Sequence, residues 1–262
     1  MAIITLLTDF SEKDGYVGIL KGVILTIAPN VRLVDLSHEI EPQDVLAGAY
    51  LLGRCAPYFP PGTIHLAVVD PGVGTARKGI AARLGDQFFV GPDNGLITLL
   101  YKNALRQKQN IEIVELNRPQ YWLKEVSPTF HGRDVFAPLA AHLANGVELK
   151  ELGTGLKDPL LLPIPEAQRT ARGWSAEIIH IDAFGNLAAS IGVKELGNEL
   201  NFQVYFKGQT IGPLKQTFGA GKPGELIALL DSAGCLALCV VNGNAAEALD
   251  ARLGDALEIQ FY

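Results

Sequence analysis

The sequence predicts two parts: an N-terminal layered α/β domain with a largely parallel sheet, and a smaller C-terminal all-β, barrel-like domain. Up to about residue 157, apolar strand-like segments alternate with amphipathic helix-like segments, which is the order of a layered α/β fold. A proline-rich stretch follows, and beyond it only short strand-like segments separated by glycine-containing turns remain. We therefore expect domains over 1–157 and 173–262, joined by a linker over 158–172.

The first part opens on an apolar strand over 3–8. A helix follows over 15–28, where apolar residues recur at helical spacing until Pro29 stops it. A strand over 64–69 is nearly all apolar, as expected of a parallel strand covered on both faces. The other expected elements are a strand over 31–36, a helix over 43–56, a hairpin over 79–84 and 87–91, a helix over 96–101, a strand over 111–116 and a helix over 134–145. In the second part we expect strands over 175–181, 202–206, 225–231, 235–241 and 257–262.

Composition excludes several classes of function. The 262-residue chain is 48% hydrophobic and carries a net charge of -6, which argues against non-specific nucleic-acid binding. No apolar run approaches the roughly 18 residues of a membrane span. The 3 cysteines lack CxxC spacing, and the N-terminus lacks the pattern of a signal peptide. We therefore expect a reduced, cytoplasmic setting with no membrane or nucleic-acid partner.

Two carboxylates follow apolar strands directly. Asp9 ends the strand over 3–8, and Asp70 ends the strand over 64–69 and opens a glycine-rich segment. Open α/β sheets place ligand chemistry at such strand ends. A buried carboxylate needs a partner, and a sugar diol suits Asp9 because one carboxylate accepts two O–H bonds. For Asp70, a structural Asp-Pro-Gly turn is the alternative. Phosphate binding is disfavoured because the usual phosphate-binding glycine motifs are missing.

Three further N-terminal motifs fit either a structural or a functional role. Asp14 precedes the first helix and could cap it. The segment Gly91-Pro92-Asp93-Asn94-Gly95 is typical of a turn. In Phe130-His131-Gly132-Arg133-Asp134, either Asp134 caps a helix or His131 belongs to a site.

A metal site is a further option for these motifs. Four carboxylates and one histidine are candidate ligands: Asp9, Asp14, Asp70, Asp93 and His131. However, no HxH, HExxH or DxD pair is present, and Arg77 and Arg133 would repel a dication. We therefore predict no metal.

The C-terminal part carries two polar segments between its strands. In Asp182-Ala183-Phe184-Gly185-Asn186, Asp182 could hold an amine and Phe184 could stack on a base; the alternative is a hairpin turn with an exposed Phe. Small residues in 231–234 and 241–246 would let the backbone approach a flat ligand closely.

Taken together, the motifs TDF…DGYVG, VVDPGVG…R, GPDNG, FHGRD and DAFGN resemble those of the S-adenosyl-L-methionine (SAM) hydrolase family, the SAM hydroxide adenosyltransferases. This family is related to the bacterial fluorinase and chlorinase. The resemblance runs from Thr8 to Ala246 and implies attack of water at C5′ of SAM, giving adenosine and L-methionine without a cofactor. It also implies a homotrimer in which each site lies between the N-terminal domain of one subunit and the C-terminal domain of the next.

The resemblance also assigns site residues. The catalytic set falls on Asp70, Arg77 and His131, and the ribose-binding carboxylate falls on Asp9. The remaining substrate contacts are Asp14, Asp182 and Ser232 for methionine, and Phe184, Asn186 and the backbone near Ala245 for adenine. There are two departures: Ser11 stands where the family commonly has glycine, and Ala233 follows Ser232 where the halogenases have an arginine.

These residue types suit the reaction. Attack at C5′ expels a neutral thioether from a sulfonium, so the leaving group needs no proton and only the water must be activated. Arg77 and His131 can hold an incipient hydroxide through charge-assisted bonds, and Asp70 can orient them or take up the proton. The alternatives are a SAM-dependent 5′-halogenase, whose halide pocket lacks such an Arg–His pair, and a non-catalytic SAM or adenosine sensor, which has no use for a nucleophile site.

Overall fold

The computed structural model describes residues 1–197 and 201–261. The chain divides into two compact units, Met1–Leu162 and Pro163–Tyr262. The division falls within the predicted linker over 158–172. Each unit has its own buried core.

The first unit is built on a seven-stranded sheet in the order β2-β1-β3-β5-β4-β6-β7. Its strands are β1 Ile3–Thr8, β2 Arg32–Ser37, β3 Ile64–Val68, β4 Gly79–Leu84, β5 Gln87–Pro92, β6 Ile111–Glu115 and β7 Thr154–Gly155. The neighbours β2, β1, β3 and β5 run parallel, whereas β4, β6 and β7 add antiparallel pairs. The predicted α/β class is therefore confirmed, with parallel pairing confined to one half of the sheet.

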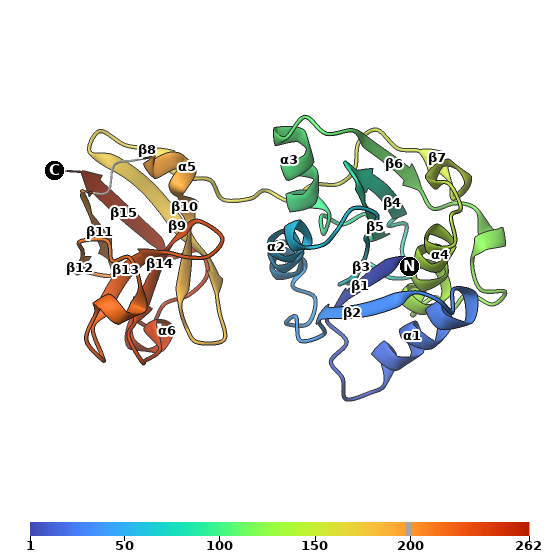
Figure 1. Cartoon of the computed structure of the whole chain (residues 1–262), viewed down its shortest axis with the longest axis horizontal. Coiled ribbons are helices and arrows are strands. Elements are labelled where there is room, and N and C mark those ends of the chain that lie inside the picture. The colour runs from blue at the N-terminus through green and yellow to red at the C-terminus, as the bar shows by residue number, and fades with distance from the viewer. Residues whose placement is uncertain (198–200, 262) are drawn as a thin grey trace. The chain divides into compact units, whose positions relative to one another are not determined.

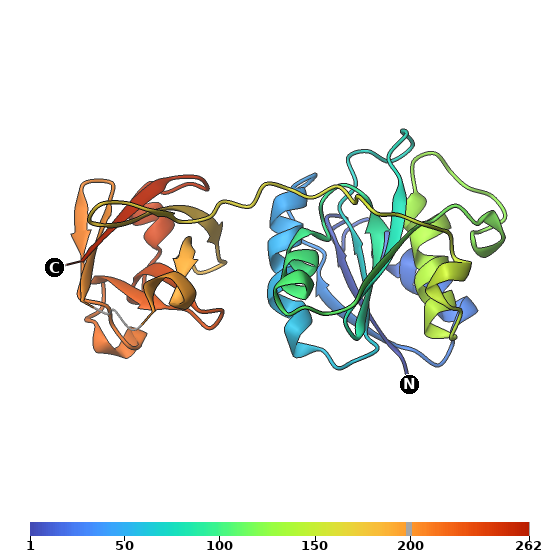
Figure 2. The ribbon, with the colours of Figure 1, turned by 90° about the horizontal axis from the view of Figure 1, so that it is seen from above.

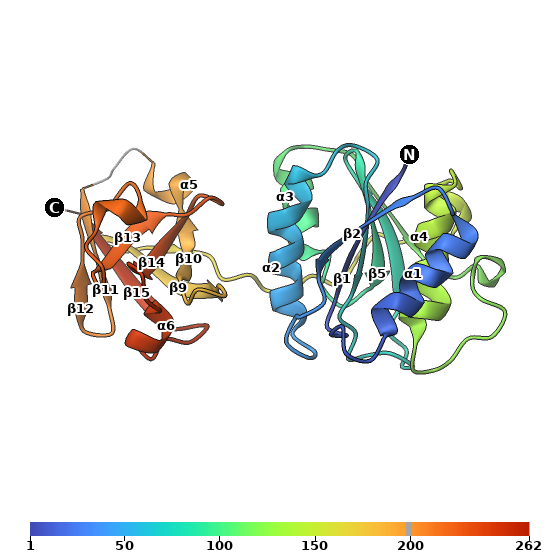
Figure 3. The same cartoon turned by 60° about the horizontal axis from the view of Figure 1, so that its bottom comes forward.

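Helices cover both faces of this sheet (Figures 1 and 3). The helices α1 Tyr16–Ile27 and α4 Ala137–Ala144 pack together on one face, and α2 Val45–Cys55 and α3 Thr98–Arg106 pack together on the other. Figure 2 shows the sheet between these two layers. The third helix continues to Arg106, well beyond the predicted range of 96–101. The predicted helix over 134–145 is α4 preceded by a π-helical turn, Gly132–Phe136.

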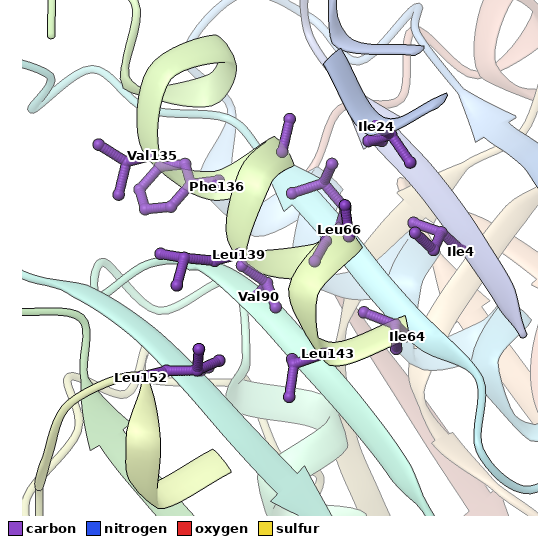
Figure 4. Packing of buried hydrophobic residues seen from close by; sticks show 14 of the residues in the cluster. Ile4, Ile24, Ile64, Leu66, Val90, Val135, Phe136, Leu139, Leu143 and Leu152 are labelled. Carbon is purple, nitrogen blue, oxygen red and sulfur yellow. The ribbon is translucent and has the colours of Figure 1, made fainter. Parts of the chain in front are cut away.

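The core lies between the sheet and these helices. Under α4, Phe136, Leu139 and Leu143 pack over Leu66 of β3 and Val90 of β5 (Figure 4). All five are buried, so the segment that begins at His131 is fixed by packing as well as by its backbone bonds.

The second unit is an antiparallel sheet of barrel shape, which confirms the predicted all-β class. The order is β12-β11-β15-β9-β10-β14-β13, with β8 beside β9. The strands are β8 Gln168–Arg169, β9 Gly173–Ile181, β10 Leu187–Gly192, β11 Phe202–Phe206, β12 Gln209–Ile211, β13 Leu226–Leu230, β14 Cys235–Val240 and β15 Ala256–Phe261. Two one-turn helices, α5 Val193–Leu196 and α6 Ala245–Ala248, join strands. Position 262, in the last predicted strand, lies outside the described residues.

Within the described residues, no helix has both the length and the apolar character needed to cross a membrane.

Candidate functional site

The two strand-end carboxylates lie at the same edge of the first sheet. β1 and β3 are parallel neighbours, and Thr8 pairs with Val68. Asp9 follows Thr8 directly, and Asp70 comes two residues after Val68. The carboxyl ends of parallel strands are where α/β sheets bind ligands.

Asp70 and Arg77 form a buried bidentate pair across a tight turn. Arg77 Nε donates to Asp70 Oδ1 at 3.0 Å, and Arg77 Nη2 donates to Asp70 Oδ2. The side chains are only 6% and 9% exposed, respectively. Within the turn, Gly74 has φ +76°, and a Cβ there would lie 2.3 Å from the Pro128 carbonyl oxygen. The absence of a side chain at Gly74 thus lets the turn pack against the segment that leads to His131.

His131 completes a bonded set of three. Arg77 Nη2 lies 3.2 Å from His131 Nδ1. A guanidinium only donates, so Nδ1 accepts, and the proton of the neutral imidazole is on Nε2. Arg77 Nη1 donates to the Lys78 carbonyl at 3.2 Å, and the guanidinium lies over the Phe136 ring, 5.2 Å from its centroid. These bonds leave Arg77 with one free N–H, on Nη1.

The pKa values of the two titratable members of this set, Asp70 and His131, are shifted in opposite directions. Burial raises the pKa of Asp70, and the adjacent Arg77 partly offsets that rise. Burial, together with the charge of Arg77, lowers the pKa of His131. Arg77 thus favours the ionised form of the desolvated Asp70 carboxylate and the neutral form of the His131 imidazole.

Asp9 is fixed by a backbone bond from a distant segment. Gln43 N donates to Asp9 Oδ2 at 2.9 Å. Asp14 is exposed, and the N-cap position of α1 is occupied by Gly15, so Asp14 does not cap the helix. Ser11 has φ +51°, in the region that favours glycine, which accounts for the glycine expected at this position.

The GPDNG and FHGRD motifs also contain structural residues. Asn94 Nδ2 donates to the Val69 carbonyl at 2.8 Å and so braces the strand end that carries Asp70. Asp93 accepts a bond from Leu160 N at 2.8 Å. Arg133 is bound to buried Asp134, at 2.5 Å from Nε to Oδ1. Asp134 also accepts from Ser127 N, so its carboxylate holds a loop rather than a helix end.

In the second unit, Asp182 organises the turn between β9 and β10. Its Oδ1 accepts from the backbone N of Phe184 and of Asn186, both at 2.9 Å, and its Oδ2 accepts from Asn186 Nδ2 at 2.9 Å. The Phe184 ring projects from this turn and is 77% exposed. The turn thus matches the structural interpretation, while leaving Asn186 Oδ1 and the exposed Phe184 ring available to a ligand.

The start of α6 places Ala245 beside this turn. Ala246 N donates to the Gly185 carbonyl at 3.0 Å, and a Cβ on Gly185 would lie 1.9 Å from Asn244 Oδ1. Phe184 and Asn186, from the Asp182 turn, and Ala245, from the start of α6, are assigned to adenine by resemblance and therefore come from two segments in direct contact.

Ser232 lies elsewhere in the unit. It is exposed in the turn between β13 and β14, where Asp231 Oδ1 accepts from Ala233 N at 2.8 Å and from Cys235 N at 2.9 Å. Because Cys235 pairs with Gly192 and Leu238 pairs with Leu187, this turn and the Asp182 turn lie at opposite ends of the β10–β14 pair. The structure therefore does not bring Ser232 and Asp182 together within one unit.

Sequence reasoning did not identify Phe136, under Arg77, or His38, which contacts the Asp9 turn. Phe136 stands within the FHGRDVF stretch, but only the three-dimensional contact gives it a role. Among the described residues, no group of three or more His, Cys, Asp or Glu side chains could hold a metal.

Comparisons with known proteins confirm the resemblance. A family model described as SAM hydroxide adenosyltransferase N-terminal domain matches residues 4–153, and the corresponding C-terminal domain matches 176–258. The chain is 40% identical to "(R)-S-adenosyl-L-methionine hydrolase" of Salinispora tropica, over 98% of this chain and 97% of that protein. It is 30% identical to "Fluorinase" of an Actinoplanes species, over 90% of each. A solved structure of an uncharacterized conserved protein from Thermotoga maritima matches with TM-score 0.89 and 35% identity, covering 98% of this chain and 99% of that one.

Proposed function

The chain belongs to the SAM hydroxide adenosyltransferase family, and from this premise we propose that it hydrolyses S-adenosyl-L-methionine to adenosine and L-methionine. The observation that carries the proposal is the bonded set of Asp70, Arg77 and His131 at the ligand-binding edge of the sheet. This set provides what hydrolysis requires and halogenation does not, which is a means of orienting and deprotonating water.

We infer the role of each member from its hydrogen bonds. The Nδ1 lone pair of His131 is occupied by Arg77, so His131 acts as a donor through Nε2–H rather than as the base. The free Nη1–H of Arg77 is a second donor to the nucleophile. Asp70 accepts two bonds from Arg77 and one from the backbone of Gly72, which leaves one lone pair for the water proton. Burial raises the pKa of Asp70 and so makes its carboxylate a stronger base.

The chemical step follows from these roles. The water oxygen attacks C5′, its proton passes to Asp70, and the C5′–S bond breaks with its electron pair remaining on sulfur. The products are adenosine and the neutral thioether of methionine. Holding the water in line behind C5′ accounts for much of the expected rate.

The substrate contacts extend the proposal to both units. Asp9 binds the ribose diol, and Asp14 binds methionine together with either Asp182 or Ser232, since these two lie at opposite ends of the β10–β14 pair. Phe184 stacks on adenine with the backbone near Ala245, and Asn186 Oδ1 accepts from the adenine amino group. The bond from Asn186 Nδ2 to Asp182 supports this last role, because it orients the amide with its oxygen free.

We also propose that the working form is a homotrimer with each site shared between subunits. Co-expressing Asp70→Ala with Asn186→Ala tests this: an intact site forms wherever a good N-terminal domain meets a good C-terminal domain. In randomly mixed trimers about a quarter of the sites are intact, so about 25% of the wild-type activity should return. A chain that carries both substitutions is the control and should rescue neither single variant to that level. A protein that is monomeric by light scattering and fully active under the same conditions would contradict the proposal.

The setting that we propose is the cytoplasm, with no cofactor. Cys55 and Cys239 carry free thiols, as is usual in proteins of a reducing compartment.

The decisive test of function is incubation of the purified protein with each sulfonium epimer of SAM, followed by chromatography. Adenosine and methionine should form in equal amounts. SAM that is bound but unchanged would indicate a sensor, and a 5′-halo-5′-deoxyadenosine formed with added halide would indicate a halogenase.

A further inference from the structure

A buried chain of polar side chains ends at the turn that carries Asp9. Thr8 Oγ1 lies 2.8 Å from His38 Nδ1, and both residues are buried, at 0% and 4% exposed. His38 Nε2 lies 3.0 Å from Asp35 Oδ1, and Lys21 Nζ donates to Asp35 Oδ2 at 2.6 Å. The chain therefore runs from an ion pair near the surface to the last residue of β1.

The bond directions in this chain are determined. The Asp35 carboxylate can only accept, so His38 Nε2 carries a proton and donates it to Asp35 Oδ1. In the neutral imidazole Nδ1 is then the acceptor, and the Thr8 hydroxyl, which itself accepts from Phe10 N at 3.2 Å, donates to it. Each group has a partner, and such a fully satisfied buried network fixes one geometry.

His38 holds the Asp9 turn from both sides. Its side chain contacts Thr8, the residue before Asp9, and its carbonyl accepts from Ser11 N at 2.8 Å, two residues after Asp9. The backbone between these two points is held in the conformation that places Ser11 in the left-handed region, while Gln43 N binds Asp9 Oδ2. The His38 side chain thus supports the start of the turn that carries Asp9, and the backbone of residue 38 supports its end.

We infer that His38 is a positioning residue that sets the Asp9 carboxylate for a ribose with both hydroxyls, and so determines discrimination against 2′-deoxy nucleosides. The inference rests on the proposed function, because Asp9 is there the ribose contact. His38 contacts no substrate and acts through Thr8 and the backbone of the turn.

The first unit contains a matched control. Thr5 and His65 form a second buried pair on the same sheet, with Oγ1 2.8 Å from Nδ1, and His65 also contacts Gln87 at 3.3 Å. Thr5 lies three residues before the strand end, so this pair has no bond to the Asp9 turn. His65→Leu removes the same kind of buried bond as His38→Leu without touching Asp9.

The experiment compares kcat/KM for SAM and for its 2′-deoxy analogue. In His38→Leu, the preference for SAM should fall about 10-fold relative to wild type, because a misplaced carboxylate loses its charge-assisted bond to the 2′-hydroxyl. The change should lie mainly in KM. His38→Asn, whose Oδ1 can still accept from Thr8, should keep most of the preference, and His65→Leu should keep all of it.

A second variant and a second readout keep the inference testable if His38→Leu does not fold. Asp35→Ala is made at a side chain that is 38% exposed and frees the His38 ring at its other end, so the preference should fall by a smaller factor, about 3-fold. The second readout is the ratio of the calorimetric dissociation constants of adenosine and 2′-deoxyadenosine, which reports on the Asp9 contact without turnover. If wild type produces no adenosine from SAM, the proposed function fails while this binding comparison still decides the role of His38. Equal losses for the ribose and deoxyribose ligands in His38→Leu and Asp35→Ala would overturn the inference, as would an equal loss of preference in His65→Leu.

Discussion

Replacing Arg77 by methionine would leave a charged Asp70 buried without its partner. The Asp70 side chain is 6% exposed, and Arg77 supplies both of its side-chain bonds. Removing one partner of a buried ion pair costs about 3–5 kcal/mol. Domains are stable by about 5–15 kcal/mol, so this single change should remove a large part of the stability of the first unit.

Urea unfolding of that unit measures the effect, because its only tryptophan is Trp122. Trp122 packs against the first core, and the other tryptophan, Trp174, packs against the core of the second unit. In a Trp174→Phe background, fluorescence therefore follows the first unit alone. With a urea dependence of about 2 kcal/mol per molar, Arg77→Met should lower the midpoint by about 2 M.

The double variant Arg77→Met with Asp70→Leu provides the control. Replacing a whole buried ion pair with apolar residues is often neutral or stabilising, so the double variant should be more stable than Arg77→Met by at least about 2 kcal/mol. The reasoning is refuted if Arg77→Met unfolds at the wild-type midpoint, or if the two substitutions simply add.

Three further outcomes follow from the site. Asp70→Asn and His131→Ala should each lower kcat by at least roughly 100-fold, and the double variant should lose little more, which single-turnover rates measure. Asp9→Ala should mainly weaken SAM binding, which calorimetry measures. The value of kcat/KM should be flat at neutral pH and fall on acidification, because protonation of Asp70 removes the base and protonation of His131 Nδ1, whose pKa is lowered from 6.5, displaces the Arg77 donor. A midpoint above pH 7 in the rate profile would contradict this assignment. High chloride or fluoride should leave adenosine as the product by chromatography, and a halogenated nucleoside as main product would overturn the hydrolase assignment.

The parallel half of the first sheet could be predicted because its strands are short apolar segments with clear breaks. Pro29 stops the first helix, and β3 is buried along its length. The antiparallel half depends on where the hairpin of β4 and β5 docks, and this is decided by packing rather than by local sequence. The π-helical turn Gly132–Phe136 was also missed, since a hydrophobic pattern does not distinguish one type of helical hydrogen bond from another.

The strand β10 was missed for a compositional reason. Its sequence, Leu-Ala-Ala-Ser-Ile-Gly, contains a single β-branched residue, and its strand conformation is imposed by pairing with β9 and β14. In the site, the turn that brings Asp70 and Arg77 together could be predicted, because the two residues are close in a glycine-rich segment. The contacts of His38 with Thr8 and of Phe136 with Arg77 span 30 and 59 residues, and no local pattern encodes them.

The charges around the proposed site explain how one arrangement can bind substrate and release product. Asp70 and Arg77 neutralise each other, while Asp9 and Asp14 leave the turn before α1 negative. SAM carries a sulfonium charge that adenosine and methionine lack, so this turn attracts the substrate more strongly than the products. A carboxylate against the sulfonium itself would stabilise the ground state and slow the attack, because that charge vanishes as the C5′–S bond breaks. Binding the ribose hydroxyls with Asp9 uses the same negative charge without placing it on sulfur. In the proposed mechanism, Arg77 and His131 donate to the nucleophile oxygen, where negative charge develops as the water loses its proton. This separation of the donors from the negative turn is what hydrolysis of a cationic substrate requires.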